Sequence, residues 1–124
     1  MKVLVIEDEP QIRDIFVEFV ELLGHEAEVA VDGRDGLARF DPLVHKIVVT
    51  DFLMPGLTGL EIAAAIQARS RTTPIVLISG SAEPQDERQA GQAGLQFLRK
   101  PVAFAQFKAA LAEAEVVEPA GAAR

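Results

Sequence analysis

The chain of 124 residues contains no cysteine. This absence excludes a disulfide framework, a thiol nucleophile and a thiolate metal site, and it leaves the redox compartment undetermined. Long hydrophobic runs are also missing near the start, where the apolar run 3–6 ends at Glu7. Such a run is too short for the core of a signal peptide or for a membrane span. We therefore expect a soluble, cytoplasmic protein with no membrane partner.

Positive charge is scarce as well. The chain has 12 lysine and arginine residues against 19 acidic residues, so its formal net charge is −7 and its isoelectric point lies near 4.8. Proteins that bind the phosphate backbone of nucleic acids normally present a basic face. We therefore expect no direct contact with nucleic acid. A chain of this length forms one domain with a single core and has no room for a second lobe.

Apolar periodicity predicts strands that alternate with helices along the whole chain. The predicted strands are 3–6, 26–30, 46–50, 75–78 and a short one near 97–98. The predicted helices are 12–23, 34–40, 60–66, 85–93 and 104–111. This alternation indicates an α/β fold with a doubly wound parallel sheet, because right-handed crossovers place helices on both faces. The fully apolar first, third and fourth strands are expected in the buried middle of that sheet.

Polar residues follow four of the predicted strands. Glu7 and Asp8 follow the first strand, Asp51 the third, Ser79 the fourth and Lys100 the fifth. The carboxyl ends of parallel strands share one edge of the sheet, so these side chains should converge. Two like charges about 4 Å apart repel by roughly 4 kcal/mol at an effective dielectric near 20, so a cluster of carboxylates requires cations. Lys100 supplies one, and Mg²⁺, which prefers oxygen ligands, is the expected second.

This set of groups indicates phosphoryl chemistry. Asp51 is the expected nucleophile toward phosphorus, and we expect it to be charged, exposed and open to in-line attack. Mg²⁺ and Lys100 would neutralise the phosphoryl oxygens, and Ser79 would donate a hydrogen bond to the product.

In this order, the motifs resemble those of the receiver domains of two-component response regulators. They are the acidic pair in IEDEP (6–10), the acceptor in DFLMPG (51–56), the hydroxyl in ISG (78–80) and the dipeptide Lys100-Pro101. The match covers residues 1–117, which leaves 118–124 as a flexible C-terminal tail. The resemblance implies a five-stranded parallel sheet in the order 2-1-3-4-5, within a flavodoxin-like three-layer αβα sandwich.

The resemblance also implies a function in a phosphorelay. A histidine kinase or a histidine phosphotransfer protein would supply the phosphoryl group from a phosphohistidine to Asp51, with Mg²⁺ as cofactor. The implied metal ligands are Asp8, Asp51 and the backbone carbonyl of Leu53, with Glu7 acting through water. Such a domain is not an enzyme toward other substrates, since it takes part only in its own phosphorylation and dephosphorylation.

The implied switch consists of Ser79 and Phe97, which would couple the phosphoryl group to a face that binds an unknown downstream protein. The Lys100–Pro101 peptide bond is expected to be cis, and the domain is expected to be a monomer or a weak phosphorylation-dependent dimer. Glu7 departs from the family pattern because aspartate is commoner there, and Val102 stands where phenylalanine is frequent. Leu53, two residues after Asp51, offers no acid or amide to position a hydrolytic water.

Three other interpretations fit parts of this pattern. A phosphatase of the haloacid dehalogenase type needs its nucleophile after the first strand and a second aspartate two residues later, where this chain has Leu53 after Asp51. A flavodoxin-like mononucleotide binder needs serine, threonine and glycine amides in its first loop, where this chain has acids. The main alternative is a receiver-like interaction module that signals without phosphorylation.

Overall fold

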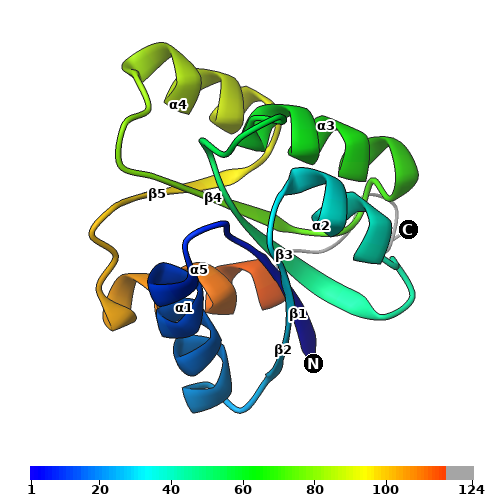
Figure 1. Ribbon diagram of the computed structural model, residues 1–124, viewed down its shortest axis with the longest axis vertical. Helices are drawn as coiled ribbons and strands as arrows, with labels where there is room; N and C mark the ends of the chain where they lie inside the picture. The colour runs from blue at the N-terminus through cyan, green and yellow to red at the C-terminus, as the bar shows by residue number, and fades with distance from the viewer. Residues whose placement is uncertain (117–124) are drawn as a thin grey trace.

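The computed structural model describes residues 1–116 and contains a parallel sheet between two layers of helices (Figure 1). The strands are β1 (Lys2–Ile6), β2 (Glu26–Ala30), β3 (His45–Asp51), β4 (Ile75–Ser79) and β5 (Gln96–Arg99). Their order is β2-β1-β3-β4-β5, and every neighbouring pair is parallel. The expected doubly wound sheet, its order and its three layers are confirmed. The predicted tail, 118–124, lies outside the described residues.

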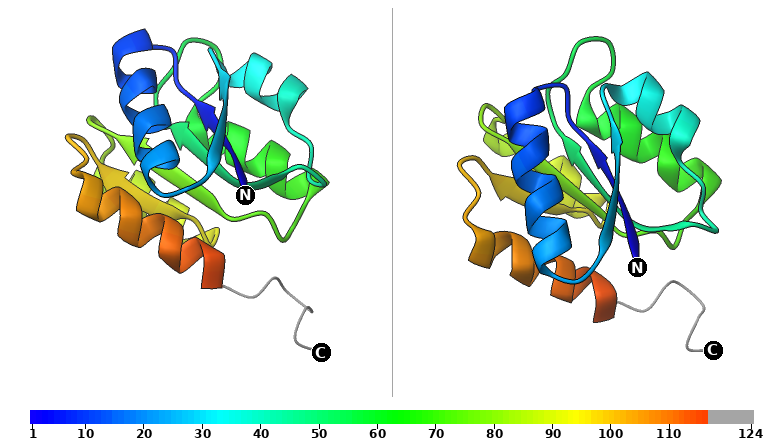
Figure 2. Two further views of the ribbon diagram at one scale, coloured as in Figure 1. Left: turned by 90° about the horizontal axis from the view of Figure 1, so that it is seen from below. Right: turned by 60° about the horizontal axis from the view of Figure 1, so that its bottom comes forward.

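The helices divide between the two faces of the sheet. They are α1 (Pro10–Leu22), α2 (Gly33–Arg39), α3 (Gly59–Arg69), α4 (Pro84–Gln92) and α5 (Phe104–Val116). Helices α1 and α5 lie side by side on one face, and α2, α3 and α4 cover the other (Figure 2). Within residues 1–116, no helix combines the length and the apolar character needed to cross a membrane.

The sheet separates the core into two apolar clusters because successive side chains of a strand point to opposite faces. In β1, Leu4 and Ile6 pack in the cluster beneath α2, α3 and α4, whereas Val3 and Val5 pack beneath α1 and α5. Strands β3 and β4 divide in the same way. Burial on both faces explains why these three strands appear in the sequence as continuous apolar runs.

The loop between β3 and α3 is held close to the end of β3. Helix α3 begins with a capping box, in which the Glu61 amide donates to Thr58 Oγ1 and the Thr58 amide donates to Glu61 Oε1. At Gly59, the first residue of α3, an added Cβ would lie 2.8 Å from Phe52 Cα and 2.9 Å from the carbonyl oxygen of Asp51. Only glycine fits this approach, which brings the start of α3 against the backbone of Asp51 and Phe52.

Strands β3 and β4 each end one residue later than the sequence predicted. Strand β3 runs through Asp51 and β4 runs through Ser79. In the sheet register Asp51 is opposite Ile78, and Ser79 is opposite Arg99. These pairings continue the ladder to the last residue of each strand. Asp51 and Ser79 are therefore fixed by strand backbone rather than placed on loops.

Candidate functional site

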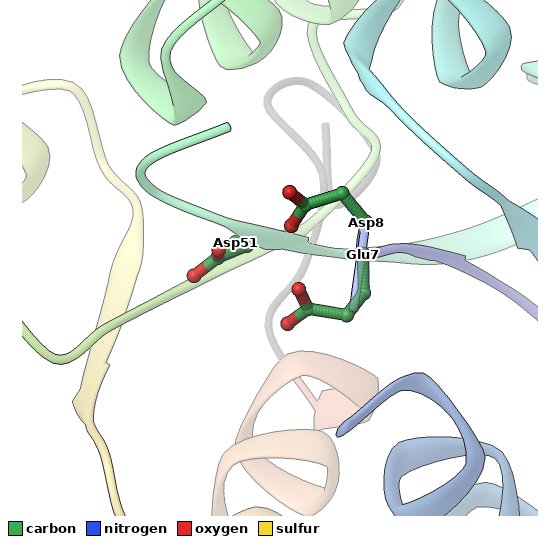
Figure 3. A group of neighbouring side chains, drawn as sticks. All are labelled: Glu7, Asp8 and Asp51. Atoms are coloured by element: carbon green, nitrogen blue, oxygen red, sulfur yellow. The ribbon is translucent and has the colours of Figure 1, made fainter. Parts of the chain in front are cut away.

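Three carboxylates gather at the carboxyl edge of the sheet. Glu7 and Asp8 directly follow β1, and Asp51 is the last residue of the neighbouring strand β3. Figure 3 shows the Glu7 and Asp8 side chains extending from the segment after β1 toward the end of β3. One oxygen from each of the three residues lies within 4.8 Å of the other two. The sequence-predicted acidic cluster is thus assembled in the structure.

Lys100, which directly follows the edge strand β5, also reaches this cluster. Its Nζ lies 3.2 Å from Asp51 Oδ1 and 3.4 Å from Glu7 Oε1. Its backbone amide donates to the Ser79 carbonyl at 2.9 Å, which fixes the residue just beyond β5. The Lys100–Pro101 peptide bond that follows is cis. The ammonium therefore contacts two of the three acids.

The expectation that Asp51 is exposed is wrong. Asp51 is only 7% exposed and Glu7 is fully buried. The physical reason is the position of β3 in the centre of the sheet, where β1 and β4 flank it and the start of α3 covers its end. A carboxylate at the end of a central strand keeps only a small outer surface. Access to Asp51 is therefore restricted to the open edge beside Asp8 and Lys100.

Burial and mutual repulsion change the acidity of these groups. Burial, followed by the charge of Asp51, raises the pKa of Glu7 to about 7 despite the opposing effect of Lys100. Burial also raises the pKa of Asp51, and Lys100 offsets this only in part. Burial disfavours the ammonium of Lys100, but Asp51 and Glu7 outweigh it and hold the pKa of Lys100 above its ordinary value. One ammonium thus leaves the negative charge of the cluster incompletely balanced.

A hard divalent cation fits this donor set. The carboxylates of Glu7, Asp8 and Asp51 are oxygen ligands close enough to share one ion. Burial raises the pKa values of Glu7 and Asp51, so a cation beside them would stabilise their charged forms. The Leu53 carbonyl stays a predicted ligand, and the Leu53 side chain is 59% exposed.

Ser79 and Phe97 lie where they can connect the acidic cluster to neighbouring segments. Ser79 is buried, and its Oγ accepts hydrogen bonds from the amides of Ser81 at 3.1 Å and Ala82 at 3.0 Å. Because a hydroxyl has two acceptor sites and one donor, its proton remains available. The Phe97 ring packs against Phe52, the residue after Asp51, with ring centroids 6.4 Å apart. The structure thus places both predicted switch residues next to the site, and their switching role stays a prediction.

Sequence reasoning missed Arg13. Its Nη1 donates to the backbone carbonyl of Glu7 at 3.1 Å, and the Glu9 amide donates to Glu7 Oε2 at 3.2 Å. The Glu9 amide orients the Glu7 carboxylate, and Arg13 holds the backbone of Glu7 in place. The available signal was a cation in the first turns of a helix that directly follows an acidic loop.

The stability of the metal-free domain is expected to depend on pH through Glu7. Since its pKa rises from the ordinary 4.5 to about 7 on folding, the folded state binds this proton more tightly than the unfolded chain does. The resulting stabilisation is complete below about pH 4.5 and is lost as pH rises through about 7. In EDTA, we expect the free energy of unfolding to be about 2 kcal/mol higher at about pH 5.5 than at about pH 8.

Urea unfolding at the two pH values measures this difference, and Glu7→Gln should remove most of it. The pKa values of Glu28 and Asp35 are lowered, mainly by hydrogen bonds from His45 and from the Val31 amide, so these groups change stability only at more acidic pH. Equal stability of the wild type at both pH values would contradict the electrostatic account of Glu7.

Known proteins resemble this chain over most of its length. The family model described as "Response regulator receiver domain" matches residues 3–112. The two-component response regulator PhoP of Pseudomonas aeruginosa is 28% identical over 112 residues, which are 90% of this chain and 50% of that protein. The gliding motility regulatory protein of Myxococcus xanthus is 29% identical over 76% of this chain and 12% of its own length. The chain thus spans half or less of these two relatives.

Solved structures agree with the sequence matches. A response regulator receiver domain protein from Clostridium thermocellum superposes with a TM-score of 0.87 at 28% identity, covering 91% of this chain and 92% of that one. The response regulator TrrA of Thermotoga maritima, solved in complex with Mg²⁺ and BeF, has a TM-score of 0.82 at 26% identity, with 91% and 97% covered. With a family model matched over almost all of the described residues, this chain belongs to the response regulator receiver domains of two-component signalling.

Proposed function

We propose that this receiver domain accepts a phosphoryl group on Asp51 from a phosphohistidine, and that Mg²⁺ takes part. The observation that supports this most is the contact of Lys100 Nζ with Asp51 Oδ1 at 3.2 Å inside the cluster of Glu7, Asp8 and Asp51. It combines a carboxylate nucleophile, a fixed cation and a set of oxygen ligands at one open edge of the sheet.

The chemistry follows from the roles of these side chains. A carboxylate oxygen of Asp51 attacks phosphorus, a phosphorus–oxygen bond forms, and the bond from phosphorus to the donor histidine nitrogen breaks. The Lys100 ammonium then interacts with a phosphoryl oxygen, and the free hydroxyl of Ser79 donates a hydrogen bond to another. Asp8, Asp51, the Leu53 carbonyl and, through water, Glu7 would hold Mg²⁺. When bound, Mg²⁺ supplies positive charge that stabilises the charge on the phosphoryl oxygens.

The donor is proposed to be a histidine kinase or a histidine phosphotransfer protein, in keeping with the family. An apolar hollow of about 330 Å³ lies beside the site and fits contact with a helix of such a donor. It is lined by Ile12, Ile15, Phe16, Lys100, Pro101 and Val102. Ile15 is 44% exposed, and Lys100 belongs both to the hollow and to the acidic cluster. A donor seated there would have its phosphohistidine next to Asp51.

Phosphorylation of Asp51 is proposed to change the surface formed by α4, β5 and α5. Ser79 bonds the loop before α4, and Phe97 lies in β5, so a movement of either changes that face. A protein of unknown identity would bind the altered surface. A local charge on Asp51 would thereby become a change in packing.

Incubation with acetyl phosphate and Mg²⁺, followed by intact mass spectrometry, tests the proposed function. We expect the wild type to gain the mass of one phosphoryl group, and we expect EDTA to prevent the gain. A wild type that gains no mass, although circular dichroism shows it to be folded, would favour an interaction module that signals without phosphorylation.

A further inference from the structure

Arg99, the last residue of β5, joins three parts of the face formed by α4 and β5. Its Nη2 lies 3.1 Å from Glu87 Oε1 on α4. Its Nη1 donates to the backbone carbonyl of Ala82, in the loop between β4 and α4, at 3.2 Å. The guanidinium carbon lies 5.6 Å from the centre of the Phe97 ring. One planar side chain thus contacts a helix, a loop and an aromatic ring.

Ala82 is held from two directions. Its amide donates to Ser79 Oγ at 3.0 Å, and its carbonyl accepts from Arg99. The residue is buried and belongs to the same apolar cluster against which Phe97 packs. The position of the Ser79 hydroxyl is therefore linked to the position of the Arg99 guanidinium through a single residue.

Phe97 is also held from two directions. Its ring packs edge to face on Phe52, the neighbour of Asp51, and the Arg99 guanidinium lies over the ring. A cation over an aromatic face is attracted by the electron density of the ring. Rotation of Phe97 away from this position separates the ring from the guanidinium.

We infer that Arg99 is a positioning residue that holds Phe97 and the loop between β4 and α4 in the unphosphorylated arrangement; this inference rests on the proposed function. If the Ser79 hydroxyl moves toward a phosphoryl group on Asp51, it pulls on the Ala82 amide to which it is hydrogen-bonded. Arg99 opposes this movement through its hydrogen bond to the Ala82 carbonyl. The movement strains the hydrogen bond between Arg99 and the Ala82 carbonyl, and the rotation of Phe97 separates its ring from the Arg99 guanidinium. Arg99 therefore opposes the change in population that the phosphoryl group must produce.

Titration with beryllofluoride and Mg²⁺, a mimic of the phosphoryl group, tests this role. Arg99→Ala is expected to bind the mimic about two- to fivefold more tightly than the wild type, a modest change because the ion pair is half exposed. Glu87→Gln, which removes only the ion pair, should give a smaller increase. Arg99→Lys keeps the charge but loses the planar donors, so it should resemble Arg99→Ala more than the wild type.

The matched control is Arg88→Ala. Arg88 is exposed on α4 next to Glu87, and its side chain makes no hydrogen bond or ion pair with any residue in 1–116. Its removal changes the net charge as Arg99→Ala does, and loss of a positive charge by itself weakens the binding of an anion. If Arg99→Ala binds the mimic more tightly than the wild type and Arg88→Ala does not, the change in net charge therefore cannot be the cause.

Amide NMR spectra can distinguish a role in the switch from a merely structural role of Arg99. Without the mimic, the Ala82 and Leu98 signals of Arg99→Ala should lie displaced toward their positions in the mimic-bound wild type. If the wild type binds the mimic but Arg99→Ala binds it no more tightly than Arg88→Ala does, the role of Arg99 is wrong and the proposed function stands. A wild type that binds no mimic would instead remove the proposed function, and the inference about Arg99 with it.

Discussion

The Asp51→Asn variant is expected to gain no phosphoryl group from acetyl phosphate and Mg²⁺ under conditions that label the wild type. An amide has nearly the same shape as a carboxylate, so the strand pairing at the end of β3 should persist. The amide is not a nucleophile toward phosphorus, and the reaction therefore loses its acceptor atom. Intact mass spectrometry measures the outcome directly, since the gain is present or absent.

The control for this variant is Asp14→Asn, which removes an exposed carboxylate on α1. It should be labelled as the wild type is. Labelling of Asp51→Asn to the wild-type extent would show that another residue is the acceptor.

Asp51→Asn is also expected to raise the melting temperature in EDTA near neutral pH. Burial raises the pKa of Asp51 more than Lys100 lowers it, so the folded domain disfavours this charge relative to the unfolded chain. Stability from such a group is present below its unfolded pKa and is lost as pH rises through its folded pKa. The amide of the Asp51→Asn variant carries no charge, so the variant does not lose this stability as pH rises. A melting temperature below that of the wild type would contradict the electrostatic argument.

The second large effect is expected from Lys100→Met. This substitution keeps an unbranched side chain but removes the ammonium that contacts Asp51 and Glu7. Two buried carboxylates then lose their cation, and removing one partner of a buried ion pair is strongly destabilising. In EDTA at about pH 8, we expect the free energy of unfolding to fall by about 3 kcal/mol.

The loss should shrink at about pH 5.5, because Glu7, whose pKa is about 7, is then protonated and carries no charge to be compensated. Urea unfolding at both pH values measures the effect. Lys108→Met serves as the control, since Lys108 is exposed on α5 and its replacement should change stability by less than about 0.5 kcal/mol. If Lys100→Met is no less stable than Lys108→Met at about pH 8, Lys100 is not the counter-ion of this cluster.

The sequence by itself determined the sheet and the edge at which the chemistry lies. Runs such as 3–6 and 75–78 are short and apolar at every position, which is typical of a strand buried on both faces. Asp51 and Lys100 come at the ends of predicted strands, and parallel strands end at one edge. Local pattern and the geometry of parallel sheets are sufficient for these conclusions, because neither depends on contacts between distant segments.

The tertiary structure alone decided how deeply the acids are buried and which neighbours they have. Asp51 was expected to be exposed, yet the flanking strands and the start of α3 enclose it, because burial depends on segments that are distant along the chain. Arg99 and Lys100 show the same dependence at adjacent positions. Lys100 reaches Asp51, whereas Arg99 reaches α4. Two adjacent cations in a sequence look alike, and only the direction of each side chain from the end of β5 gives them different partners.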